Sequence, residues 1–347
     1  MTDAAGRTDP GVPHDGADSV VPHDGAAPSD ERVVHEAVEP AADSTAPSTV
    51  RFRIDLGYDG TDFHGWAVQP ALRTVQGVVE EGLALICGAP VRTVVAGRTD
   101  AGVHARRQVV HCDLPADLLP RLAGRGARTR EPADGLVSRL RGVLGHRDAP
   151  DIVIHAVQQV PQAFDARFAA VWRRYSYRIA DERSLRDPLS VRQTASMRGA
   201  LDVDAMQRAA QEVVGLHDFL PFCKPRPEST TIRTLLDLQV EREGDGVIRF
   251  DLRADAFCHH MVRALVGGLV RVGSGAWSVT EPAVLLARAG QGAIREELPP
   301  LHLMPAHGLV LEEVGYPEGE RAWAQQAATA RNRRRVEELG GSARPTI

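Results

Sequence analysis

Residues 96–105 read Ala-Gly-Arg-Thr-Asp-Ala-Gly-Val-His-Ala, between two stretches whose composition is typical of β-strands. A connection between strands can present a side chain at the edge of a sheet. Gly97 and Gly102 allow unusual backbone conformations on either side of Asp100. The loop could therefore hold a carboxylate nucleophile beside a guanidinium group. The alternative is a capped turn in which the aspartate only accepts local backbone hydrogen bonds.

Apolar periodicity predicts the same order of elements before and after the middle of the chain. In the first half we expect strand 50–58, helix 74–87, strands 91–95 and 108–112, a mostly helical stretch 114–144 with a surface loop at 124–135, and strand 151–160. In the second half we expect strand 172–178, a helix from 202 or 203, strands 233–240 and 247–256, a helix after 257, and strand 308–316. The order is strand, helix, strand, strand, helix, strand in both halves.

This repeat of pattern defines the predicted domain organisation. We expect a disordered acidic tail at 1–49, an N-terminal α+β domain with the catalytic loop at 50–163, a C-terminal α+β domain at 164–317, and a C-terminal tail at 318–347. The predicted fold class is α+β, with two ferredoxin-like (RRM-like) α/β halves joined into an extended, mostly antiparallel sheet with a central cleft.

Charge and cysteine content limit the possible classes of protein. The 347 residues carry a formal charge of −5, but residues 1–49 hold ten acids and two arginines, so the remainder carries +3 and permits RNA binding. The four cysteines form no Cys-x-x-Cys pair, which argues against a zinc ribbon or a disulfide scaffold and fits a reducing cytoplasm. No apolar stretch reaches the roughly 20 residues of a membrane span, and no signal peptide is visible. We therefore expect a cytoplasmic protein without a membrane partner.

Two motifs carry a resemblance to a known family. Residues 97–105, Gly-Arg-Thr-Asp-Ala-Gly-Val-His-Ala, and residues 257–263, Phe-Cys-His-His-Met-Val-Arg, are similar to motifs of the tRNA pseudouridine synthase A family. The resemblance covers residues 50–317. It implies an enzyme that converts uridine to pseudouridine at positions 38, 39 and 40 of the tRNA anticodon stem-loop. It also implies a homodimer that needs no metal and no organic cofactor.

The resemblance also assigns roles to individual residues. It implies that Asp100 is the catalytic carboxylate and that Arg98 takes part in flipping the target base. It further implies that Tyr175 contacts that base and that Arg263 lies beside the catalytic aspartate. Contacts with tRNA are implied for Phe164, Asp165, Ala166, Arg167 and Phe168, and for Ser229 and Thr230 in a loop whose local match is weak.

The implied reaction makes specific demands on these residues. The N-glycosidic bond must break, the uracil must rotate, and its C5 must bond to C1′, with no oxidation. One carboxylate must act at the sugar, either by attacking C1′ or by removing the 2′ proton, and the sequence leaves both routes open. A neighbouring cation favours the ionised form of Asp100. Fixed donors can stabilise the detached uracil, and the target nucleotide must leave the helical stack.

Two other functions fit parts of the sequence. A non-catalytic RNA-binding module of RRM-like fold could use strand 172–178, where Tyr175 and Tyr177 share one face. A metal-dependent hydrolase could use His64, His104, Asp100 and His259, although no recognised metal-binding spacing occurs. Adjacent histidines on a helix point about 100° apart, so residues 259 and 260 are expected to be poorly placed for one metal ion. We therefore predict no metal site.

Overall fold

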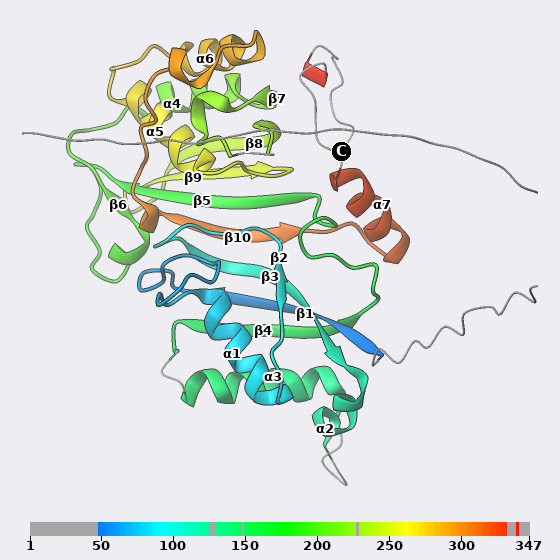
Figure 1. The fold of residues 1–347 in the computed structure, drawn as a ribbon. Helices are drawn as coiled ribbons and strands as arrows, with labels where there is room; N and C mark the ends of the chain where they lie inside the picture. Colours follow the sequence, from blue (N-terminus) through cyan, green and yellow to red (C-terminus); the bar gives the residue numbers. More distant parts are fainter. Residues whose placement is uncertain (1–47, 125–129, 147–148, 227–228, 332–337, 340–347) are drawn as a thin grey trace, which may run out of the picture. The chain divides into compact units, whose positions relative to one another are not determined.

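The computed structural model describes residues 48–124, 130–146, 149–226, 229–331 and 338–339. These residues belong to one compact unit, shown as coloured ribbon in Figure 1. The predicted acidic tail falls on residues that, up to position 47, lie outside the described part of the chain.

Ten described strands form one large, mostly antiparallel sheet (Figure 1). They are β1 (Thr49–Tyr58), β2 (Thr93–Val95), β3 (His104–Pro115), β4 (Ile152–Val160), β5 (Trp172–Ala180), β6 (Ala195–Ser196), β7 (Gly215–Asp218), β8 (Ile232–Arg242), β9 (Ile248–Ala254) and β10 (Leu309–Gly315). The order across the sheet is β4-β1-β3-β10-β5-β9-β8-β7, with β2 also beside β3 and β6 also beside β5. Two pairs, β3–β10 and β5–β6, are parallel.

Each half of the chain builds the same strand arrangement. The first half gives β4-β1-β3-β2, and the second gives β10-β5-β9-β8. Both halves therefore place their first, second, third and fourth main strands in the order four, one, three, two, which is the predicted ferredoxin-like arrangement. One sheet runs through both halves, so the division into two domains at residues 163 and 164 stays a prediction.

The two halves meet along one edge of β3. The other edge of β3 is occupied by β1. On the shared edge, β2 pairs with residues 110–112 and β10 pairs with residues 104–105. The loop at 96–103 leaves the sheet where β2 ends and returns beside β10. The topology thus brings the motif loop of the first half to the strand that joins the second half to it.

Seven helices are described, and each half contributes helices that pack on its own strands. They are α1 (Val75–Cys87), α2 (Leu119–Ala123), α3 (Pro132–His146), α4 (Val203–Glu212), α5 (Met261–Gly273), α6 (Glu281–Gly290) and α7 (Glu320–Arg331). In the first half α1 packs on α3, and α3 packs on β4. In the second half α4 packs on β8 and on α5 (Figure 1).

Local sequence explains why the strongest predictions were confirmed. In β1 the alternating residues Phe52, Ile54 and Leu56 are fully buried, as expected for a strand with one face in the core. The hydroxyl of Thr74 accepts a hydrogen bond from the backbone of Gly77 and begins α1. The carboxylate of Asp202 begins α4 in the same way. Such caps satisfy amide groups that the first helical turn leaves free.

Two of the expected elements differ in extent or type because pairing with another strand decides them. The strand expected at 108–112 is the centre of a twelve-residue strand, β3, which is paired along most of its length by β1. The helix expected from 202 or 203 ends at Glu212, and residues 215–218 form β7, which pairs with β8. Val214, between the helix and this strand, is 38% exposed.

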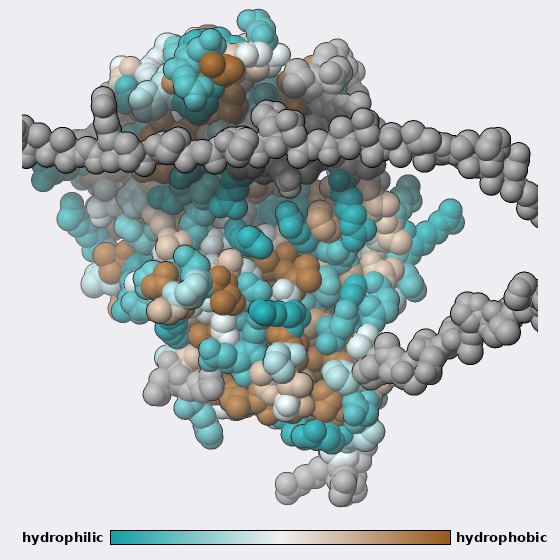
Figure 2. Space-filling model, viewed as in Figure 1, coloured by the Kyte–Doolittle hydropathy of each residue, from teal (hydrophilic) through white to brown (hydrophobic). Residues whose placement is uncertain are grey.

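The outer surface of the first half carries apolar side chains. Leu85 on α1 is 60% exposed, and a cavity of about 450 Å³ opens beside it between α1, α2 and α3. Figure 2 shows apolar residues reaching the surface in this part of the molecule. Among the helices in the described part of the chain, none combines the length and the apolar composition that crossing a bilayer requires.

Candidate active site

The loop at 96–103 has a defined conformation that begins with a turn around Asp100. The carbonyl oxygen of Asp100 accepts a hydrogen bond from the amide of Val103, at 3.2 Å. Gly102 has a φ of +77°, which a residue with a Cβ adopts only with strain. Gly97, by contrast, has no positive φ. The expected backbone freedom is therefore needed on one side of the aspartate only.

The loop that follows β1 supports this turn. The hydroxyl of Tyr58 lies 2.8 Å from that of Thr99, and the amide of Trp66 donates to the carbonyl of Thr99 at 3.0 Å. A Cβ on Gly60 would lie 2.0 Å from the carbonyl oxygen of Val103, so only glycine permits this close approach. Trp66 itself is 1% exposed and serves the core.

Asp100 lies among three basic side chains from α5 and the residues just before it. Its Oδ1 is 3.6 Å from His259 Nε2, and its Oδ2 is 3.6 Å from His260 Nε2 and 3.5 Å from Arg263 Nη1. The carboxylate side chain remains 29% exposed. It also faces the first turn of a thirteen-residue helix, whose amino end favours negative charge. The predicted neighbourhood of Asp100 and Arg263 is present, and the carboxylate can be reached from solvent.

The two histidines converge on this carboxylate because neither of them lies in the helix. The helix α5 begins at Met261, and His260 before it has a φ of +68°. This left-handed backbone turns the two imidazoles to the same side, with ring centroids 3.8 Å apart. The expectation that the two adjacent histidine side chains point about 100° apart, as in a helix, was therefore wrong at this position.

The imidazoles of His259 and His260 are poorly solvated and surrounded by charge. Burial lowers the pKa of both rings below the ordinary value. Asp100 opposes this shift, while the neighbouring cations, including Lys224 and Arg226, add to it. Each ring also has a buried Nδ1 without a hydrogen-bond partner in the described part of the chain. Both rings are thus neutral at neutral pH.

These histidines and the aspartate form the one group among the described residues that could hold a metal ion. Their ligand atoms all lie within 4.8 Å of one another. The hydrolase alternative had also used His104, but that ring contacts Asp59 at 3.0 Å and the carbonyl of Arg192 at 2.7 Å. The guanidinium of Arg263 beside the aspartate opposes binding of a divalent cation.

Tyr175 lies on β5, with its ring packed against the segment that carries the histidines. The ring of Phe257 meets it edge-on, with centroids 5.0 Å apart. Burial raises the pKa of the Tyr175 phenol, and the charge of Asp100 adds to the rise. Tyr175 therefore stays a protonated phenol at neutral pH. Tyr177, on the same strand face, is fully buried and donates to the carbonyl of Pro305 at 2.7 Å. It is a core residue.

Arg173 is a residue of the site region that sequence reasoning missed. Its side chain is buried, and burial lowers its pKa. The guanidinium donates to the carbonyls of Ala96 at 2.9 Å, Arg167 at 2.6 Å and Asp255 at 2.8 Å. It thereby ties together the start of the motif loop, the segment after β4 and the end of β9. In the sequence Arg173 is one arginine among several, and nothing in the residues around it indicates this role.

The segment 164–168 divides into buried and accessible side chains. Phe164 and Ala166 are fully buried, and Phe164 packs edge-on against Trp323 of α7 at 5.2 Å. Asp165 accepts hydrogen bonds from the amides of Arg167 and Phe168, at 2.9 Å each. Arg167 is exposed and Phe168 is partly exposed. Side chains that could touch a ligand here are therefore those of Arg167 and Phe168, supported by the others.

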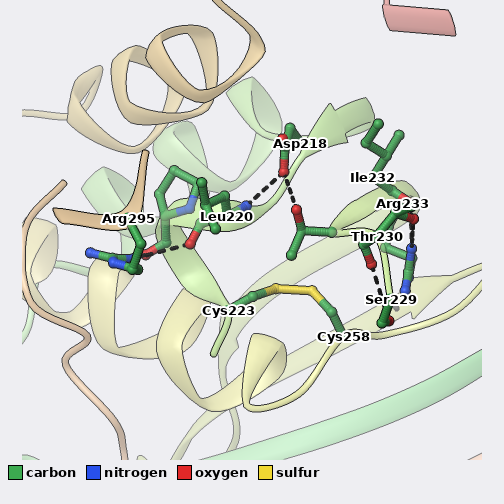
Figure 3. The surroundings of a disulfide bond; sticks show 11 residues. Asp218, Leu220, Cys223, Ser229, Thr230, Ile232, Arg233, Cys258 and Arg295 are labelled. Carbon is green, nitrogen blue, oxygen red and sulfur yellow. Dashed lines mark hydrogen bonds between the residues drawn. A yellow bond between two sulfur atoms is a disulfide. The ribbon is translucent and has the colours of Figure 1, made fainter. Parts of the chain in front are cut away.

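The loop that carries Ser229 and Thr230 is attached to the same site. A disulfide bond joins Cys223 to Cys258, which directly precedes the two histidines (Figure 3). The amide of Lys224 donates to the carbonyl of His259 at 3.0 Å. The cysteine spacing had argued against disulfides, but the fold brings these two, 35 residues apart, to a Cα separation of 6.0 Å.

Asp218 bonds to residues at both ends of this loop. Its carboxylate accepts hydrogen bonds from the amide of Leu220 and from the hydroxyl of Thr231 (Figure 3). Ser229 is exposed and Thr230 is partly exposed. Arg98 is also exposed, and within the described residues its side chain has no hydrogen bond or ion pair. The hydroxyl of Thr230, by contrast, accepts a hydrogen bond from Arg233 at 3.2 Å.

Comparison with known proteins gives a consistent picture. A family model described as "tRNA pseudouridine synthase" matches residues 209–317. A tRNA pseudouridine synthase A of Leifsonia xyli subsp. xyli (strain CTCB07) is 50% identical over 273 residues, covering 77% of this chain and 92% of the relative. That of Cutibacterium acnes (strain DSM 16379 / KPA171202) is 46% identical over 291 residues, covering 82% and 95%.

Similarity to solved structures is much weaker. A chain of the "Structure of H/ACA RNP bound to a substrate RNA containing 2'-deoxyuridine" is 10% identical, with a TM-score of 0.27 over 63% of this chain and 53% of that chain. A similarity this low supports no conclusion on mechanism.

Proposed function

The chain belongs to the tRNA pseudouridine synthase A family, and we propose that it modifies positions 38, 39 and 40 of the tRNA anticodon stem-loop with Asp100 as the catalytic carboxylate. As a member of that family it is a tRNA pseudouridine synthase, an isomerase that binds tRNA. One observation carries the proposed role of Asp100. It is a solvent-accessible carboxylate held between two imidazoles and a guanidinium group, on a loop at the junction of the two halves.

Asp100 is proposed to act at the sugar of the target uridine. It either attacks C1′ or removes the 2′ proton, and both routes require a carboxylate that can approach the ribose. Arg263 balances its charge, and the amino end of α5 adds a favourable dipole. Arg263 is itself held by a hydrogen bond from its Nε to the carbonyl of Met304, at 2.7 Å, so the pair is positioned before substrate arrives.

Three further side chains are proposed to handle the base and the backbone of the tRNA. Tyr175 contacts the target base as a neutral phenol, while Arg98 fills the space that the flipped nucleotide leaves or holds a phosphate. Arg167 combines a cation with the adjacent ring of Phe168, a pairing suited to phosphate and base contacts. Phe164, Asp165 and Ala166 support this segment, and Ser229 and Thr230 add polar contacts from the loop tied to α5.

The remaining features of the proposal rest on the family alone. We propose that the enzyme works as a homodimer in the cytoplasm without a metal or an organic cofactor, and that its two halves form a central cleft for the tRNA. The reaction is an isomerisation without a redox step, which is consistent with a site built from acid, imidazole, phenol and guanidinium groups.

The test is tritium release from tRNA that contains 5-tritiated uridine. The purified chain should release tritium from tRNA with uridine at positions 38, 39 or 40, and Asp100→Ala should abolish release. Binding of tRNA should stay within about 10-fold, because phosphate contacts dominate affinity. Asp134→Ala, at an exposed acid on α3, is the matched control and should keep full activity. Turnover by Asp100→Ala would refute the assignment.

A further inference from the structure

We propose that His104 is a positioning residue that holds the loop of Asp100 in place through one tautomer of its imidazole, with the proton on Nε2. The proposal rests on the proposed role of Asp100. His104 is the first residue of β3 and follows Val103, whose amide closes the turn around Asp100. The residue is 6% exposed and pairs with Val310 of β10, where the two halves meet. Its influence on the carboxylate therefore passes through the backbone of the loop.

The two ring nitrogens of His104 have partners of opposite kind. Its Nδ1 lies 3.0 Å from the amide nitrogen of Gly60, and its Nε2 lies 2.7 Å from the carbonyl oxygen of Arg192. A backbone amide can only donate a hydrogen bond, and a carbonyl oxygen can only accept one. A neutral ring with its proton on Nε2 satisfies both groups, whereas the other neutral tautomer satisfies neither.

One carboxylate competes with Gly60 for the same ring nitrogen. Oδ1 of Asp59 also lies 3.0 Å from Nδ1 of His104, and a protonated Nδ1 could donate to it. That oxygen, however, already accepts hydrogen bonds from the amide and the hydroxyl of Thr61, at 3.0 and 2.6 Å. The other carboxylate oxygen lies 3.4 Å from Nη1 of Arg192. A proton on Nδ1 would deprive the buried amide of Gly60 of its acceptor, which is costly, so the geometry favours the proton on Nε2.

The contact with Gly60 reaches the catalytic loop because the two backbones touch. A Cβ on Gly60 would lie 2.0 Å from the carbonyl oxygen of Val103, so any shift of one backbone moves the other. The amide of Phe63 donates to the carbonyl of Gly60 at 3.1 Å, and the carbonyl of Phe63 accepts from the amide of Gly102 at 3.2 Å. Residues 60–63 thus lie along the two residues that end the turn. Fixing Gly60 therefore fixes the turn that presents Asp100.

The contact with Arg192 brings in the second half of the chain. Arg192 lies in a short 3₁₀ helix at Val191–Gln193, after β5, and is 88 residues from His104 in sequence. One imidazole therefore joins the loop after β1, the end of the catalytic loop and a segment of the second half. Arg263 and Tyr175 also belong to the second half, so this joint helps to set the position of Asp100 relative to them.

A displaced carboxylate should slow the chemistry and spare tRNA binding. An error of about 1 Å in the position of a reacting group can cost about 100-fold in rate. The affinity for tRNA comes mainly from phosphate contacts, and the side chains proposed for tRNA contacts lie on other segments. A fault in the position of Asp100 should therefore lower kcat and leave KM close to the wild-type value.

Two variants of His104 separate the contacts of its two nitrogen atoms. In His104→Asn the side-chain oxygen can take the place of Nδ1 and accept from Gly60. In His104→Gln the side-chain amide can take the place of Nε2 and donate to Arg192, but Gly60 loses this acceptor. For tritium release from 5-tritiated uridine in tRNA, we expect kcat to fall by about 10- to 100-fold in His104→Gln and to stay much nearer the wild-type value in His104→Asn. His146→Gln, at an exposed histidine on α3, is the control.

Two further measurements need neither substrate nor turnover. Nitrogen NMR of the wild-type protein with isotope-labelled histidine should show the ring of His104 protonated at Nε2 and unprotonated at Nδ1. Hydrogen exchange of the amides of Gly60 and Val103 should be faster in His104→Gln than in His104→Asn, because only the asparagine can replace the acceptor of Gly60. Urea unfolding of both variants shows whether a difference in rate is merely a difference in stability.

Each of these measurements can overturn the proposal. A ring of His104 that carries its proton on Nδ1 would do so, even if neither variant could be purified in folded form. So would a His104→Asn variant that is no faster than His104→Gln, whether both variants were slow or both matched the wild type. A fall in rate that follows a rise in KM alone would place His104 in tRNA binding and not in the positioning of Asp100.

The outcomes also distinguish this inference from the function on which it rests. If the wild-type chain released no tritium from any tRNA, the proposed function would be wrong, and the NMR measurement would still decide the tautomer. If the wild type were active and Asp100→Ala inactive, but both variants of His104 unaffected, the function would stand and the positioning role would fall.

Discussion

The guanidinium of Arg173 donates a hydrogen bond of 2.9 Å to the carbonyl oxygen of Ala96, across 77 residues of sequence. Ala96 is the first residue of the loop that carries Asp100, and Arg173 lies on β5 two residues before Tyr175. This one contact therefore fixes the motif loop of the first half against the strand of the second half that carries Tyr175.

Removing this contact should destabilise the whole fold. Arg173→Met leaves buried carbonyl oxygens without a donor, and we expect the free energy of unfolding to fall by about 3 kcal/mol or more. Arg173→Lys should not rescue it, since one ammonium group cannot reach three carbonyls from the positions of a planar fork. Urea unfolding measures both. Arg174→Met is the control, because its pairing with Glu313 is partly exposed and should cost about 1 kcal/mol at most. Equal losses for the two positions would contradict this role of Arg173.

Removing only the hydroxyl of Tyr175 should slow the chemistry and leave the fold intact. Tyr175→Phe keeps the edge-on packing with Phe257 but loses a donor beside Asp100. We expect the single-turnover rate to fall about 10-fold, which corresponds to about 1.4 kcal/mol, with tRNA affinity and thermal stability near wild type. Tyr177→Phe should show the opposite pattern, a loss of stability through its hydrogen bond to Pro305. An unchanged rate in Tyr175→Phe would move the role to another residue.

Breaking the disulfide should lower stability without changing the core. The bond closes a chain segment of 35 residues, for which loop-closure entropy predicts up to about 4 kcal/mol. Replacing Cys223 and Cys258 together by serine should lower the urea midpoint, while Cys87→Ser, at a free and partly exposed cysteine, should not. Thiol titration of the unfolded, unreduced protein should find two free thiols, those of Cys87 and Cys112. Four free thiols would contradict the bond.

Acid should weaken the second half through Asp181. Burial alone would raise the pKa of this carboxyl group, but hydrogen bonds from Arg242 and from the amides of Leu201 and Arg183 lower it well below the usual range. A pKa that is lower in the folded state stabilises the fold above the unfolded-state value of about 3.9, and this contribution is lost as the pH falls below it.

Unfolding measured against pH can isolate this contribution. The stability difference between wild type and Asp181→Asn should be full at neutral pH and shrink below pH about 4. Glu182→Gln, at the exposed neighbouring residue, should show no such dependence. A difference that stays constant from pH 7 to pH 3 would show that the carboxylate charge is not what stabilises this contact.

Local patterns were enough to predict most of the secondary structure, whereas the role expected for Asp100 came from the family resemblance. The alternation in β1 and the caps of α1 and α4 are short-range features, because periods of 2 and 3.6 residues and a side chain bonding an amide three positions on do not depend on the rest of the chain. Asp100 and Arg263 could be singled out because the two motifs that contain them resemble motifs of the family.

What only the tertiary structure decided is how the parts of the site come together. Strand β7 and the full length of β3 exist through pairing, and the cysteines at 223 and 258 meet only in the folded chain. The convergence of His259 and His260 on Asp100 depends on a left-handed residue before α5 and on the parallel contact of β3 with β10. The disulfide joins residues 35 apart in sequence, and the histidines meet Asp100 across more than 150 residues. No periodicity within a single segment encodes these contacts. The sequence determines which residue types form the site. The distances between those residues are set only when the two halves share one sheet.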